Sequence, residues 1–187
     1  MKYTPTRDDA FNLLKKYNKS GALINHGLAV EGVMRHFAKK YNEDEDKWGI
    51  IGLAHDLDYE MYPEHHCIKT KEILEENKWP AEYIRAIISH GWGICNDIEP
   101  ILPLEKTLYT IDELTGFITA CALVRPSKSV MDLEVKSVKK KWKVKKFAAG
   151  VNRDTIINGA KMMNIELNDL IHEVIIAMRK IAQEIGL

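Results

Sequence analysis

The chain has 187 residues, a formal net charge of zero, 45% hydrophobic residues and 29% charged residues. These values are typical of one globular domain with a sizeable core, and a neutral chain gives no global attraction to nucleic acid. No apolar run is long enough to span a bilayer, and the N-terminus lacks a secretory leader. The three cysteines form no CxxC motif, so we expect a cytoplasmic protein without membrane contact or a disulfide framework.

The hydrophobic pattern predicts helices along the whole chain. The first clear case is an inward stripe that recurs every three or four residues: His26, Val30, Val33, Met34 and Phe37. A histidine on such a stripe should point toward the core. After an acidic connection, the next predicted helix begins near Trp48 and carries His55 and Asp56 at its end.

Further helices follow at intervals marked by proline and glycine. Pro63 suits a helix start and precedes a predicted helix over 65–77. The segment "KWPAEY" opens a helix that runs to His90, and the glycines and prolines of 91–104 predict a long loop. The remaining predicted helices cover about 104–124, 129–147, 153–163 and 167–185. No segment alternates like a strand, so the predicted fold is all-α.

Ligand-type side chains recur at the ends or on the inner faces of these helices: His26, His55, Asp56, His66, His90 and Asp112. A buried imidazole or carboxylate is costly unless it is paired, hydrogen-bonded or bound to a metal. Imidazole nitrogens and carboxylate oxygens are ligands of divalent first-row cations. We therefore predict a metal site. The alternative is that each of these side chains is simply a hydrogen-bonded residue of the core. That explanation would have to apply independently to residues on separate helices.

The order of these six residues resembles the HD superfamily (HDIG-type) of metal-dependent phosphohydrolases. The likeness covers about 22–124 and extends to "INHGLAVEGVMRHFA", "LAHDLDYEMYPEHH" and "AIISHGW". It implies a single HD-domain helical bundle over 1–187, with additional C-terminal helices over about 125–187.

The resemblance also implies one or two divalent transition-metal ions, drawn from Fe, Mn, Ni, Co and Zn. The first ion would have four ligands: His26, His55, Asp56 and Asp112. His66 and His90 would hold a second ion, with Asp56 as a bridge that takes part in catalysis. For Asp58 three roles stay open: a general base, a side chain that orients a ligand histidine, or a surface carboxylate.

The function implied by the resemblance is hydrolysis of a small phosphoester, with a nucleotide as the favoured substrate, by metal-activated water. Two alternatives stay open. The same ligands suit a di-iron oxygenase of the HD type, and the chain could also be a non-catalytic metal- or nucleotide-binding module. A homodimer is a further option.

Seven lysines and no acidic residue lie between Lys136 and Lys146. Such a run is ordinarily a solvated face, but here it follows the "RPSK" break after the Asp112 helix. That order could bring basic groups to the mouth of the metal site, where lysines bind phosphate as point charges. We therefore predict that Lys128 and Lys136 bind substrate. Nucleic acid is disfavoured because no stacking aromatics interleave with the lysines.

Overall fold

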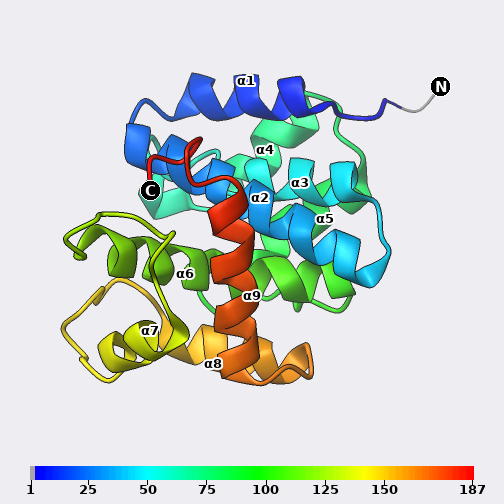
Figure 1. Cartoon of the computed structure of the whole chain (residues 1–187). Helices are drawn as coiled ribbons and strands as arrows, with labels where there is room; N and C mark the ends of the chain where they lie inside the picture. Colours follow the sequence, from blue (N-terminus) through cyan, green and yellow to red (C-terminus); the bar gives the residue numbers. More distant parts are fainter. Residues whose placement is uncertain (1–2) are drawn as a thin grey trace.

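The chain folds into helices joined by turns and loops, in a computed structural model that describes residues 3–187 (Figure 1). Extended pairing in these residues is limited to an isolated bridge between Trp92 and Asn96, so the predicted all-α fold is confirmed. None of the helices in the described range is both long and apolar enough to cross a membrane. In chain order the helices are α1 (Arg7–Tyr17), α2 (Gly21–Tyr41), α3 (Glu45–Leu53), η1 (Pro63–His65), α4 (Ile68–Glu76), α5 (Ala81–Ile88), η2 (Ser89–Gly91), α6 (Pro103–Leu123), α7 (Val135–Trp142), α8 (Arg153–Met162) and α9 (Leu167–Lys180), where η marks a 3₁₀ helix.

The two longest helices, α2 and α6, pack against each other, and α3 and α8 pack against them in turn. The apolar members of the predicted α2 stripe are buried, which confirms that this face points into the core. Gly52 allows α3 to approach α2 closely, because a Cβ at this position would come 2.9 Å from Met34 Cγ and 3.1 Å from Val30 O. This close approach positions the end of α3 beside α2.

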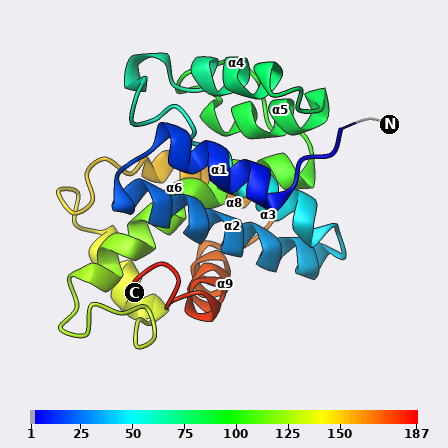
Figure 2. The same cartoon turned by 90° about the horizontal axis from the view of Figure 1, so that it is seen from above.

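The C-terminal third shares the same hydrophobic core. Val130, Leu133 and Val138 belong to the core cluster, together with the inner face of α9. In Figure 1, α9 crosses α2 and α6, and the view in Figure 2 places α4 and α5 together on the opposite side of α2 from α9. The side-chain amide of Asn25 donates to the carbonyl of Ile185, which ties the C-terminal segment to α2.

The helix predicted over 129–147 is wrong in length, because α7 covers only Val135–Trp142. Before α7, the guanidinium of Arg179 donates to the carbonyls of Val130 and Leu133. After α7, the guanidinium of Arg153 donates to the carbonyls of Val144 and Phe147. The carbonyls of Leu133 and Phe147 therefore bond to side chains from α9 and α8, whereas those of Val130 and Val144 also accept the backbone N–H group three residues later, as in isolated turns.

The predicted helices around the metal-site residues end slightly earlier than expected. Helix α3 ends at Leu53, so His55 and Asp56 lie just beyond it, and α5 ends at Ile88, so His90 lies in the η2 turn that follows. His66 follows the η1 turn and precedes α4. Side chains at these junctions can turn toward a common point.

Candidate metal centre

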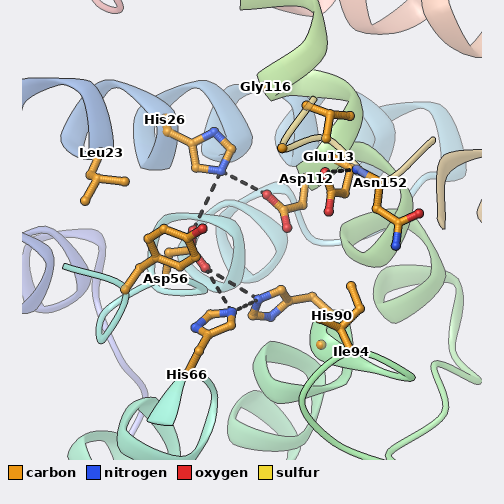
Figure 3. Close-up of a pocket in the computed structure, with 14 residues that line it drawn as sticks. Leu23, His26, Asp56, His66, His90, Ile94, Asp112, Glu113, Gly116 and Asn152 are labelled. Carbon is orange, nitrogen blue, oxygen red and sulfur yellow. Dashed lines mark hydrogen bonds and ion pairs between the residues drawn. The ribbon is translucent and has the colours of Figure 1, made fainter. Parts of the chain in front are cut away.

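A cavity of about 450 Å³ lies where the helix junctions meet the facing sides of α2 and α6 (Figure 3). Its walls include five of the six predicted ligands: His26, Asp56, His66, His90 and Asp112. The sixth, His55, is fully buried behind them. The structure thus brings together all six residues that the sequence selected, from separate parts of the chain.

His55 and His90 reach the site through the same local arrangement. Each follows the last residue of its helix by two positions, and each places Nδ1 against a carbonyl three residues earlier. The distances are 2.7 Å from His55 Nδ1 to Gly52 O and 2.6 Å from His90 Nδ1 to Ile87 O. The last carbonyls of a helix lack backbone partners, so they are available as acceptors. Because a carbonyl can only accept, Nδ1 carries a hydrogen, and Nε2 is the nitrogen left to bind a cation in the site.

The first group of ligand atoms comes from His26, His55, Asp56 and Asp112, and these atoms lie within 4.8 Å of one another. His55 Nε2 is 3.3 Å from Asp56 Oδ2 and 3.3 Å from Asp112 Oδ1. His26 Nε2 is 2.9 Å from Asp112 Oδ1 and 3.9 Å from Asp56 Oδ2. Two imidazole nitrogens and two carboxylate oxygens therefore converge on one small volume.

The second group comes from Asp56, His66 and His90. Asp56 Oδ1 lies 3.6 Å from His66 Nε2 and 3.5 Å from His90 Nε2, and the two Nε2 atoms are 3.1 Å apart. Asp56 thus turns one oxygen to each group, which is the arrangement expected of a bridging carboxylate. In Figure 3 its carboxylate lies between His26 on one side and His66 and His90 on the other.

The buried Nε2 atom of His55 has no hydrogen-bond partner among the described residues. It faces two carboxylates without hydrogen-bond geometry to either, and a bound cation would supply the partner that it lacks. Burial disfavours the imidazolium of His55, but the charges of Asp56 and Asp112 outweigh this and raise its pKa well above the ordinary value. Burial opposes ionisation of Asp112, yet the charge of His55 and the hydrogen bond from His26 lower the pKa of Asp112 below its usual range. Carboxylates held in the charged form, and Nε2 atoms that release their protons when a cation binds, form the donor set that a divalent cation needs.

Asp58 is fully buried, and both of its oxygens are engaged. Oδ1 accepts from His66 Nδ1 at 2.8 Å, and Oδ2 accepts from the backbone N–H of Thr70 at 2.8 Å. This geometry favours the orienting role among the three alternatives for Asp58. A general base would need a free oxygen toward the cavity, and a surface carboxylate would be exposed.

The predicted substrate lysines lie elsewhere. Lys128 and Lys136 are both exposed, and neither lines the cavity. The ammonium of Lys136 pairs with Glu134 at 2.7 Å. Lys128 lies in the turn after α6, where Arg125 pairs with Asp132. The structure does not bring these two lysines to the candidate ligands, because both side chains lie exposed on the surface outside the cavity wall.

Three residues of the cavity wall did not stand out in the sequence. Glu113 follows Asp112 and accepts from the backbone N–H of Asn152 at 2.9 Å. Burial, and then the charge of Asp112, raises the pKa of Glu113. The ring of Tyr59 packs edge-on against His66, with centroids 5.3 Å apart. An acid beside a predicted ligand was a usable signal for Glu113, whereas Asn152 reaches the cavity only through packing of the segment before α8 on α6.

No family model and no solved structure matches the chain. The site is therefore described from its own donor atoms, their burial and the distances between them. Groups of histidine and aspartate side chains in the described residues can hold a metal ion.

Proposed function

We propose that the chain is a metal-dependent phosphohydrolase of the HD superfamily that acts on a small phosphoester, with a nucleotide as the favoured substrate. The carrying observation is the carboxylate of Asp56, which turns separate oxygens to two ligand groups at the wall of one cavity. The ligand residues also occur in the chain order of that superfamily.

A bound divalent ion lowers the pKa of a coordinated water and neutralises charge on a phosphoryl group. The residues of the chain would hold and orient the ligands for this chemistry. His26, His55, Asp56 and Asp112 would bind one ion. His66 and His90 would bind a second ion together with Asp56, and Asp58 would fix the ring of His66.

The cavity wall supports a role for cations in phosphate recognition. Its described lining includes the carboxylates of Asp56, Asp112 and Glu113 and contains no lysine or arginine. An anionic substrate meets no permanently positive side chain there. We therefore expect phosphate to bind only to the metal-loaded protein.

Two neighbouring cavities offer room for the rest of a substrate. One, of about 460 Å³, shares His26 and Gly116 with the central cavity and has a largely apolar wall. The other, of about 340 Å³, shares Asn152 and includes Trp92 and Asn158. An aromatic ring beside amide groups suits the stacking and hydrogen bonding of a nucleobase, which favours a nucleotide over a bare phosphoester.

Elemental analysis and activity screening test the proposal together. The purified protein is expected to carry at least one transition metal per chain. Supplied with Mn, Fe, Co, Ni, Zn or Mg, it is expected to hydrolyse members of a nucleotide and phosphoester panel. Asp56→Asn should lose both metal and activity, whereas Asp8→Asn, an exposed carboxylate on α1, should keep both.

Dioxygen consumption separates the oxygenase alternative. A metal-loaded protein that turns over no phosphoester but consumes dioxygen with a reduced organic substrate would replace the hydrolase with a di-iron oxygenase. A protein that binds nucleotide and metal but does neither would be a binding module.

A further inference from the structure

Two cysteines that are far apart in the sequence meet beside the metal centre. Cys67 Sγ and Cys95 Sγ are 2.9 Å apart, and both are free thiols. Cys67 precedes α4, whereas Cys95 lies in the loop after η2. A disulfide bond is about 2.05 Å long, so the sulfurs need to approach by roughly 0.9 Å to form one.

The thiol pair joins the two segments that supply His66 and His90. Cys67 directly follows His66 in the chain. On the other segment, Gly91 directly follows His90, and the Sγ of Cys95 lies 3.6 Å from the carbonyl oxygen of Gly91. A bond between the sulfurs would therefore link the two histidine-bearing segments.

Two backbone features accommodate this pair of thiols: a glycine at position 91 and a positive φ at Cys67. A Cβ at position 91 would come 2.2 Å from the sulfur of Cys95 and 2.6 Å from that of Cys67, so only glycine leaves space for both. Cys67 itself has φ of 66°, in the left-handed region that favours glycine. A side chain kept in such a conformation points to a function for that side chain.

We propose that Cys67 and Cys95 are a redox-active dithiol that a hydroperoxide oxidises to a disulfide. The sulfur of Cys95 attacks the outer oxygen of ROOH, the O–O bond breaks, and ROH leaves as Cys95 becomes a sulfenic acid. The sulfur of Cys67 then attacks the sulfenic sulfur, the S–S bond forms, and water leaves. Two thiols and one hydroperoxide thus give one disulfide, one alcohol and one water.

Burial assigns the order of these steps. Cys95 is partly exposed and can meet an oxidant, whereas Cys67 is 3% exposed and can meet only its neighbour. The third cysteine, Cys121, is buried in α6 and provides an internal control. The proposal does not depend on hydrolase activity, because it concerns only the two sulfurs.

Peptide mapping tests the proposal on the full-length, metal-loaded protein. The reduced protein is freed of reductant, treated with hydrogen peroxide, alkylated with N-ethylmaleimide and digested without reduction. The expected product is a pair of peptides joined through Cys67 and Cys95 that dithiothreitol separates, with Cys121 recovered in alkylated form. Recovery of Cys67 and Cys95 as alkylated thiols, at peroxide levels that oxidise a free dithiol, would overturn the proposal.

Single variants and a chelator sharpen the outcome. Cys67→Ser should leave a sulfenic acid on Cys95 that dimedone traps, whereas Cys95→Ser should leave Cys67 unoxidised. If either variant fails to fold, the map of the unmodified chain still decides. The linkage should also form in EDTA, because the thiols supply both electrons. A linkage that requires bound metal would assign the oxidation to the metal and overturn the proposal.

Discussion

At the scale of the residue, three histidines of the candidate metal centre have their rings fixed by hydrogen bonds from Nδ1. His55 and His90 donate to main-chain carbonyls, whereas His66 donates to the carboxylate of Asp58. A carboxylate partner fixes the tautomer and also raises the basicity of the ligand nitrogen. His66 should therefore depend on a single side chain for both orientation and affinity.

The variant Asp58→Asn tests that dependence. The amide has one acceptor oxygen for two donors, His66 Nδ1–H and the backbone N–H of Thr70, so one of them loses its acceptor. We expect metal affinity to fall about 10–100-fold and unfolding free energy to drop by about 1–3 kcal/mol. Competition with a chromophoric chelator and urea unfolding measure the two effects, with Asp8→Asn as control. An unchanged affinity would leave Asp58 with only a structural role.

The same contact makes the stability of the metal-free protein depend on pH. Burial disfavours the imidazolium of His66, but the hydrogen bond to Asp58 and nearby carboxylate charges outweigh it and raise its pKa to about 9. The unfolded chain has a histidine pKa of about 6.5, so the stabilisation is complete below that pH and is lost as the pH rises toward 9. It amounts to about 3 kcal/mol at most.

Comparison with His66→Gln isolates this contribution. In EDTA, the difference in unfolding free energy between the unmodified chain and the variant should be larger at pH 6 than at pH 9.5. With metal bound the trend should reverse, because the cation competes with protons for the ring. A difference that stays constant across this interval would contradict the assigned ion pair.

At the scale of the element, two glycines show how closely the helices around the cavity approach. Gly116 lies one turn after Asp112 on α6, where a Cβ would meet nothing closer than Val151 Cγ2 at 4.0 Å. Gly159 lies on α8 against α6, where a Cβ would come 2.0 Å from Thr110 Oγ1. A methyl group therefore fits at Gly116, whereas at Gly159 the side chain of Thr110 already fills the space.

Alanine at these positions should have opposite effects. Gly116→Ala is expected to stabilise the protein by about 0.5–1 kcal/mol, because alanine is the better helix former. Gly159→Ala is expected to destabilise it by about 1–3 kcal/mol, because α6 and α8 must move apart. Urea unfolding at constant metal concentration measures both. If both variants changed the unfolding free energy by the same amount and in the same direction, the predicted difference in space at the two positions would be wrong.

At the scale of the whole molecule, the residues of the candidate metal centre come from α2, the turn after α3, the η1–α4 junction, η2 and α6. A cation bound to side chains from all of these segments binds the folded state and not the unfolded chain. Ligand binding of this kind adds about 2.7 kcal/mol to stability at a free ligand concentration of 100 times Kd.

Chelation should therefore lower the melting temperature. Scanning calorimetry of the metal-loaded and EDTA-treated protein measures the shift, and added metal should restore it. The variant His55→Ala, which lacks a ligand of the first group, should show a much smaller response to EDTA. Identical melting curves for verified loaded and metal-free protein would contradict a centre shared by these segments.

Local patterns in the sequence were sufficient for the helical class, the inward stripe of α2 and the six residues that meet at the candidate metal site. Helical periodicity is visible within a few consecutive residues. Burying an imidazole or carboxylate among apolar neighbours costs free energy in any fold, so such residues stand out before the fold is known. The membership of Asp58 in the site was also foreseen, although its role was not. The resemblance to HD phosphohydrolases stays a prediction.

Only the tertiary structure decided which atoms face one another. Contacts between separate segments give Asp56 one oxygen for each ligand group, pair Asp58 with His66 and bring Cys67 to Cys95. Helix α7 is short, the carbonyls before and after it bond to the side chains of Arg179 and Arg153, and its exposed lysines lie outside the cavity wall. These outcomes depend on packing between segments far apart in the chain, and local hydrophobic periodicity carries no information about that packing.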